Sequence, residues 1–316
     1  MIHLRKLVLG LICFLLTLTT GLCLSGIVSR WSDSKDFKEV APVLTSSVAP
    51  ETSSDSGQEN SLPLSDLFTD GDELSYNGHT VKKMRKRVHY DGSTWVDATY
   101  AVIRKGSKSC VTLDAGIYHP LENATRFGLF SFLGKGSQQF VVSEDVPRGG
   151  KQWVVSLEPT CRVIFDGSKW GVGRESDDFG VLDLDGDGVY EITAPITDLY
   201  DLQDKMSIYQ IPLPVIVFKY SPTAKIYLPA NHRFPDYFLE SLSDITTESD
   251  SDEYAAKSRI LRLLLDYVYA GNEEKGWALF EQQYTFSDEV EVRKRVWAIL
   301  RNQPVYRYMR AQRLRA

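Results

Sequence analysis

Two stretches of the chain resemble each other at a separation of about 52 residues, and this repeat limits the possible folds more than any other feature. Phe127-Gly128 in "RFGLFSFLGKGSQQFVV" returns as Phe179-Gly180 in "DFGVLDLDGDGVYEIT". The segments "CVTLDAG" and "CRVIFDG" repeat at nearly the same offset, and "YDGSTW" returns as "FDGSKW". Self-similarity at this period is typical of a structural unit used more than once, and here it indicates repeated antiparallel β units.

The region from about residue 76 to 227 has the alternation of β-strands. In "TWVDATYAVI" every second residue from 96 to 102 is apolar, which is typical of a half-buried strand. Two hairpins are expected, one joined by "DVPRGGK" and one over 216–228 with its turn at Ser221-Pro222. No long helical period interrupts the strands, which argues against a parallel α/β sheet. The fold class predicted is mainly antiparallel β, with a small C-terminal α-helical region.

The C-terminal region, residues 254–316, has a different period. Apolar residues take helical spacing between Ile260 and Val268. A second helix is expected over 273–284, and a third is expected to begin with Ser287 as its N-cap. "YVYAGNEEKGWALFEQ" resembles one tetratricopeptide-type helix hairpin, matching at Tyr267, Gly271, Gly276 and Phe280. Because a peptide-binding solenoid needs about three or more repeats, a small helical cap on the β domain is the favoured interpretation.

The N-terminus predicts export. Arg5 and Lys6 precede an uncharged run from Leu7 to Val28, which is long enough for a membrane span of roughly 20 residues and has the order of a secretory signal. A retained anchor, cleavage near Cys23 to Gly26 and a lipid-attached Cys23 all remain open. Each places the rest of the chain on the extracytoplasmic side of the cell envelope, membrane-anchored or secreted.

Low-complexity segments separate the parts of the chain. Residues 31–67 are rich in Ser, Pro, Thr and acids, a composition that predicts a disordered tether. The expected organisation is a signal or anchor (1–30), the tether, a β domain (68–240), an acidic linker (241–253) and the helical region.

The charge distribution bears on partners. A net charge of −6 and a pI near 5.5 argue against nucleic acid as a partner. The basic run "KKMRKR" at 82–87 and the Arg-rich tail after Arg293 are candidates for contact with anionic lipid or polymer, although a solvated charged face is favoured for both.

Of the four cysteines, Cys13 and Cys23 belong to the apolar segment, which leaves Cys110 and Cys161 in the exported part. Export permits a disulfide between them, and two buried free thiols are the alternative. Equivalent strands of neighbouring repeats can lie close together, which favours the disulfide.

The stretch "DLDGDGVYE" predicts a metal site. Asp183, Asp185 and Asp187 alternate along the chain, and Gly186 and Gly188 allow the chain to curl so that the carboxylates converge. Ca²⁺ accepts 6 to 8 oxygen ligands in flexible geometry and is the expected ion. The carbonyl of Val189 and the carboxylate of Glu191 are the remaining candidate ligands.

The segment "DFGVLDLDGDGVYEI" resembles the FG-GAP or VCBS type of repeat, found in β-propellers and in many exported bacterial proteins. The resemblance implies a calcium loop between two strands, with ligands at Asp183, Asp185, Asp187, Val189 and Glu191. The first copy has Ser131, Leu133, Lys135 and Gln139 at the corresponding positions, so we expect it to bind no metal. A closed propeller typically needs 4 to 8 blades. The β region has room for about three units, which favours a propeller-like array or compact twisted β repeats.

No catalytic motif is recognisable. The five histidines stand beside no recognisable nucleophile or metalloprotease motif. The function expected is a non-enzymatic, exported calcium-binding β module that binds a protein or an envelope polymer. The alternatives are an envelope hydrolase acting on carbohydrate or peptide, and a scaffold whose helical end docks a protein.

Overall fold

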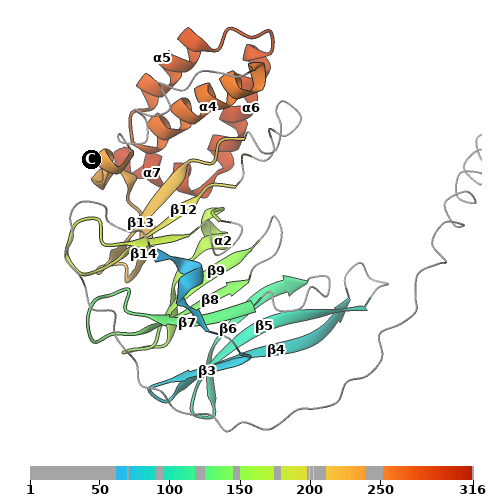
Figure 1. Ribbon diagram of the computed structural model, residues 1–316, viewed down its shortest axis with the longest axis vertical. Coiled ribbons are helices and arrows are strands. Elements are labelled where there is room, and N and C mark those ends of the chain that lie inside the picture. The colour runs from blue at the N-terminus through green and yellow to red at the C-terminus, as the bar shows by residue number, and fades with distance from the viewer. Residues whose placement is uncertain are drawn as a thin grey trace, which may run out of the picture. The chain divides into compact units, whose positions relative to one another are not determined.

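The computed structural model describes residues 62–69, 71–89, 95–117, 125–144, 150–173, 179–197, 199, 202, 211–238 and 252–314. All of them belong to one compact unit (Figure 1). The expected anchor at 7–28, the tether up to residue 61 and most of the acidic linker lie outside the described residues. Among the helices that the structure describes, none is both long and apolar enough to cross a membrane.

The described strands form three antiparallel sheets, which confirms the predicted fold class. Sheet C is a meander in the order β3-β4-β5-β6. Its strands are β3 (Glu73–Tyr76), β4 (His79–His89), β5 (Trp95–Lys105) and β6 (Lys108–Ile117). One face of β4 turns toward sheet B, and on that face Val81, near the start of the strand, is fully buried.

Sheets A and B share one topology. Sheet A has the order β1-β11-β12-β13-β14, and sheet B has the order β2-β7-β8-β9-β10. Sheet A consists of β1 (Leu62–Pro63), β11 (Gly180–Leu182), β12 (Glu191–Pro195), β13 (Val215–Ser221) and β14 (Ile226–Pro229). Sheet B consists of β2 (Phe68–Thr69), β7 (Thr125–Phe130), β8 (Gln139–Glu144), β9 (Lys151–Ser156) and β10 (Arg162–Asp166). Each is a four-stranded meander with a short fifth strand at its edge. The expected hairpins are β8–β9 and β13–β14.

The repeated Phe-Gly pair has the same place in both sheets. Phe127 and Phe179 are buried, and the glycine after each one pairs with the short edge strand, Gly128 with Phe68 and Gly180 with Pro63. A Cβ atom on Gly128 would overlap the carbonyl oxygen of Leu67. Glycine at this position therefore allows the edge segment to approach the sheet closely.

That edge segment begins earlier than the sequence indicates. Residues 62–67, which the composition assigns to the tether, form β1 and the 3₁₀ helix η1 (Leu64–Leu67). Leu64 is buried in the core and its amide donates to the carbonyl of Phe179. Composition does not predict this structure, because the segment contacts strands that are distant in the sequence: β1 pairs with β11, and Leu67 lies against Gly128 of β7.

The C-terminal helices pack on sheet A and share its core, as Figure 1 shows. They are α4 (Glu253–Tyr269), α5 (Glu273–Gln283), α6 (Glu289–Asn302) and α7 (Pro304–Arg313). The N-cap of α6 is Asp288, not Ser287. The helix α7 lies where the sequence indicates only a basic tail; it buries Val305, Tyr306 and Met309.

One hydrogen bond ties the helical end to the β repeats. The side chain of Gln303, the N-cap of α7, accepts from the Tyr306 amide at 3.0 Å. Its amide nitrogen donates to the carbonyl of Trp170 at 2.7 Å, at the end of the short helix α2 (Gly167–Trp170). The helical region therefore packs on the β domain, as the sequence predicts.

Candidate functional site

The acidic loop, residues 183–190, connects β11 to β12 in sheet A. Gly186 and Gly188 have positive φ angles of 67° and 78°, the curled conformation that the sequence predicts. The carboxylate oxygens of Asp183, Asp185 and Asp187 lie within 4.8 Å of one another. The loop therefore does bring the three predicted carboxylates together.

Backbone amides hold two of these carboxylates in place. Asp183 Oδ2 accepts from the Gly188 amide at 3.0 Å, and Asp187 Oδ1 accepts from the Val189 amide at 2.8 Å. The other oxygen of Asp183, Oδ1, is buried and has no hydrogen-bond partner. A buried carboxylate oxygen without a partner is unfavourable unless something binds there.

Lys219, on β13, supplies a positive charge to this cluster that the sequence analysis missed. Its Nζ donates to Asp185 at 2.9 Å, to Asp187 at 2.9 Å and to Glu191 at 2.7 Å. Glu191 is fully buried, and its second oxygen accepts from the Leu184 amide at 2.8 Å. Both oxygens of Glu191 are therefore already occupied by donors of the protein.

The pKa values of this cluster reflect burial and the shared lysine. Burial raises the pKa of Glu191, although the hydrogen bond from Lys219 opposes the rise. The hydrogen bond from Lys219 lowers the pKa of Asp187. Burial by itself would lower the pKa of Lys219, but its hydrogen bonds to three carboxylates outweigh burial and raise it. Lys219 is therefore charged at any physiological pH.

The acidic loop also contacts the corresponding loop of the other repeat, residues 131–138, here called the first-copy loop. The Tyr190 amide donates to the Phe132 carbonyl at 2.9 Å, and the rings of Tyr190 and Phe130 meet edge to face at 4.9 Å. The Tyr227 hydroxyl donates to the Tyr190 carbonyl at 2.9 Å. The acidic loop thus lies at a junction between the two repeats.

The five predicted ligand residues differ in how well their surroundings suit a bound cation. Asp183, Asp185 and Asp187 each present one oxygen to a common point, and Asp183 also has a buried, unpaired oxygen, which suits a hard cation such as Ca²⁺. Glu191 does not suit a ligand role in this arrangement, because Lys219 and Leu184 hold its carboxylate. For Val189 the amide contact to Asp187 is described, and the ligand role of its carbonyl stays a prediction.

In the first-copy loop, Ser131, Leu133, Lys135 and Gln139 stand in place of the acids. Gln138 Nε2 donates to Ser131 Oγ at 2.9 Å. The buried Gln139 accepts from the Leu133 amide at 3.3 Å, a role similar to that of Glu191. Ser131 and Gln139 thus form local hydrogen bonds, and Lys135 is exposed. No carboxylate is present there to hold a cation.

The structure joins Cys110 and Cys161 in a disulfide, with 6.0 Å between their Cα atoms. Cys110 belongs to β6 of sheet C, and Cys161 directly precedes β10 of sheet B. The bond therefore links the two sheets covalently.

The remaining clefts bear on the enzyme alternative. One, near 271–277, has a volume of about 600 Å³ and is lined by Glu273 and Glu274. Glu273 accepts from the Tyr306 hydroxyl at 2.7 Å and pairs with Arg313 at 3.5 Å. Its carboxylate thus links α5 to α7 within the helical region.

Comparisons of the chain with models of known protein families, with curated proteins and with solved structures find no match.

Proposed function

We propose that this protein is an exported, non-enzymatic β module whose acidic loop binds calcium and that acts by binding a protein or an envelope polymer. Asp183, Asp185 and Asp187 would hold the ion. The observation that supports this most is the buried, unpaired Oδ1 of Asp183, a residue that offers one carboxylate oxygen within 4.8 Å of one from Asp185 and one from Asp187. A bound cation would give that oxygen the partner that it lacks.

Charge balance supports the same proposal. Four carboxylates surround one ammonium group, that of Lys219. Three negative charges are left over when all of these groups are ionised. A divalent cation would offset most of this excess, and Asp183, which Lys219 does not contact in the described structure, is the natural place for it to bind.

The position of the loop suggests what calcium would do. Because the acidic loop contacts the first-copy loop through Tyr190, an ion that orders it would stabilise the junction between sheets A and B. The role proposed is therefore structural. The apolar segment 7–28 would hold the module at a membrane or direct its secretion, which fits the proposed extracytoplasmic location.

The test is thermal unfolding of the full-length chain with calcium and with chelator. A ligand that binds only the folded state at 100 times its Kd adds about 2.7 kcal/mol of stability. We expect a calcium-dependent rise in the midpoint of several degrees for the wild type. The rise should vanish in Asp183→Asn/Asp185→Asn, and it should persist in Asp166→Asn, a control outside the loop.

Two results would contradict the proposal. Equal midpoints in calcium and chelator would mean that the loop binds no calcium that stabilises the folded state. A rise that the double variant retains would place the calcium elsewhere in the chain. Magnesium in parallel would show whether the loop prefers the larger ion.

A further inference from the structure

The ammonium group of Lys219 already binds carboxylates that the sequence predicts to bind a metal ion. The side chain of Lys219 is 9 % exposed. Its Nζ lies 2.9 Å from both oxygens of Asp185 and 2.9 Å from Oδ2 of Asp187. Lys219 thus holds three of the six carboxylate oxygens that the three aspartates of the acidic loop offer. A metal ion that binds these aspartates has to share those oxygens with the lysine or displace it.

Asp183 is the aspartate that the lysine leaves incompletely satisfied. Backbone amides donate to two further oxygens of the cluster, Oδ2 of Asp183 and Oδ1 of Asp187. The sixth oxygen, Oδ1 of Asp183, is buried and has no hydrogen-bond partner. A buried acceptor without a partner is unfavourable. Asp183 is therefore the place where a second cation gains the most by binding.

Glu191 gives Lys219 a position that does not depend on the aspartates. Ile192 and Phe218 are opposite each other on β12 and β13. Glu191 precedes the first and Lys219 follows the second, so the two are adjacent across the strands. Their hydrogen bond, at 2.7 Å, is shorter than those from Lys219 to the aspartates, and Glu191 is fully buried. Lys219 can therefore release the aspartates and stay paired with Glu191.

The charges of the cluster allow a metal ion and the lysine together, but at a cost to each. Three aspartates and one glutamate carry four negative charges when all are ionised, and Lys219 offsets one of them. Calcium would offset two more. Two cations held by the same carboxylates repel each other, however, and the repulsion is strongest where water is excluded. The charge of Lys219 should therefore weaken calcium binding.

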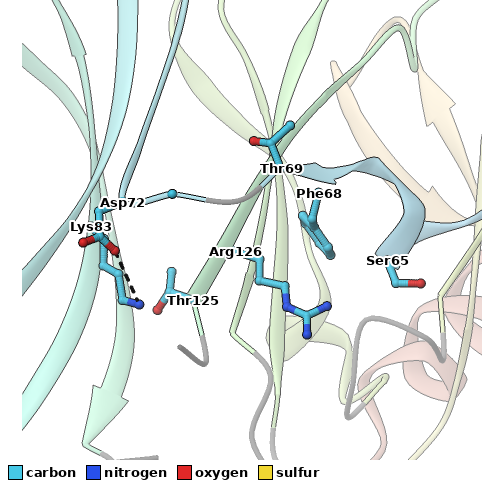
Figure 2. A pocket seen from close by; sticks show the side chains of 8 residues that line it. Ser65, Phe68, Thr69, Asp72, Lys83, Thr125 and Arg126 are labelled. Atoms are coloured by element: carbon cyan, nitrogen blue, oxygen red, sulfur yellow. Dashed lines mark ion pairs between the residues drawn. The ribbon is translucent and has the colours of Figure 1, made fainter. Parts of the chain in front are cut away.

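Lys83, a second buried lysine, lacks this arrangement. Its side chain is 6 % exposed, and its ammonium lies 3.8 Å from Asp72, as Figure 2 shows. Asp72 is itself 76 % exposed, so solvent screens this pair. The cleft beside Lys83 is lined by one acid, Asp72. Lys83 is therefore a matched control for Lys219, because it has similar burial and the same charge but lies in sheet C, outside the acidic loop.

We infer that Lys219 competes with calcium for the acidic loop. While the ion is absent, Lys219 neutralises Asp185 and Asp187 and keeps the loop in place. When calcium binds at Asp183, it displaces the ammonium group from the other two aspartates, and Lys219 stays with Glu191. Glu191 thus belongs to the lysine and not to the ion. This inference rests on the proposed function, since it assumes that the three aspartates bind calcium.

The test is calorimetric titration of the full-length chain with calcium, in detergent and at one ionic strength. The proteins compared are the wild type, Lys219→Met and Lys83→Met. We expect Lys219→Met to bind calcium about tenfold more tightly than the wild type, or better. Lys83→Met should stay within about threefold of the wild type, because charges far apart are screened. Both variants lose one positive charge, so a difference between them does not come from net charge.

A second variant covers the case in which Lys219→Met does not fold. Lys219→Met/Glu191→Gln removes the lysine together with its buried partner, so its net charge equals that of the wild type. All three aspartates remain, and the oxygens that Lys219 held are free. We expect this variant to bind calcium about threefold more tightly than the wild type, or better. Weaker binding than in the wild type would show that Glu191 is a ligand and would overturn the inference.

The outcomes separate this inference from the proposed function. Calcium binding by none of the proteins would overturn both. Binding by the wild type that is as tight as that of both variants without Lys219 would overturn the inference alone. Binding only by the variants without Lys219 would support the competition and overturn the proposed function, because the lysine would then have taken the place of the ion.

Discussion

Sheets A and B are two copies of one architecture whose equivalent loops differ in charge. In the acidic loop, Asp185 and Asp187 accept hydrogen bonds from Lys219, which directly follows Phe218 on β13. At the equivalent place in sheet B, Ser156 stands opposite Gln139. The first-copy loop contains no acid, and Ser156 takes the place of the lysine that pairs with the acids of the other copy.

The backbone of the loop does not depend on those charges. Gly134 and Gly136 of the first-copy loop have positive φ angles of 93° and 89°, as Gly186 and Gly188 do in the acidic loop. Since both copies place glycines at the equivalent turn positions, the glycines determine the turn. The comparison teaches that the carboxylates are an addition to a turn that forms without them, which is the pattern of a binding site.

Of the variants that test this difference between the repeats, Lys219→Met should lower the free energy of unfolding the most. In Lys219→Met, the fully buried Glu191 and two aspartates lose their counter-charge. Removing one partner of a buried ion pair typically costs about 3–5 kcal/mol. The measurement is the free energy of unfolding in urea, with chelator present.

The matched change in the other copy is Ser156→Ala. It removes one hydrogen bond, from Ser156 to the Glu158 carbonyl, and should cost about 1 kcal/mol. Adding Glu191→Gln to Lys219→Met should recover a large part of the lost stability. Equal losses in the two single variants would show that the charges do not distinguish the repeats.

Alanine substitutions at Gly128 and Gly188 should lower the free energy of unfolding by smaller and unequal amounts. Gly128→Ala should cost about 1–3 kcal/mol, because its Cβ would overlap the Leu67 carbonyl and displace the edge segment. Gly188→Ala has open space around it and should cost about 1 kcal/mol from backbone strain alone. Urea unfolding of both variants measures the difference, and the opposite order would refute the role given to Gly128.

Titration of Asp187 should produce the smallest effect. The hydrogen bond from Lys219 lowers its pKa below the usual 3.8. The stability that this carboxylate contributes is therefore present above its unfolded pKa and lost as the pH falls through the lower folded value. Because 45 % of the side chain is exposed, solvent screening limits the contribution to below about 1 kcal/mol.

The measurement compares the wild type with Asp187→Asn in chelator, from neutral pH to about pH 2. The difference in unfolding free energy should be constant near neutral pH and vanish at the acid end. The first-copy loop contains no acid, so Ser131→Ala should show no such change with pH. A difference that stays constant over the whole range would mean that the charge of Asp187 is irrelevant.

Much of the fold could be predicted because its determinants are local. The alternation of apolar residues predicts β5, the turn residues predict the hairpins β8–β9 and β13–β14, and the period change after residue 253 predicts α4 and α5. The helix α7 was missed, although Gln303-Pro304 is a typical helix start, because its many arginines suggest a frayed tail. Residues 62–67 were missed because composition does not reveal pairing with distant strands.

The sequence by itself determined the strands, the glycine turns and the convergence of three aspartates, since each depends on residues a few positions apart. Only the tertiary structure decided that Lys219, 28 residues from Glu191, shares that cluster. The physical reason is that register and sheet packing bring distant residues together, and a charge acquires its partners only after both are set.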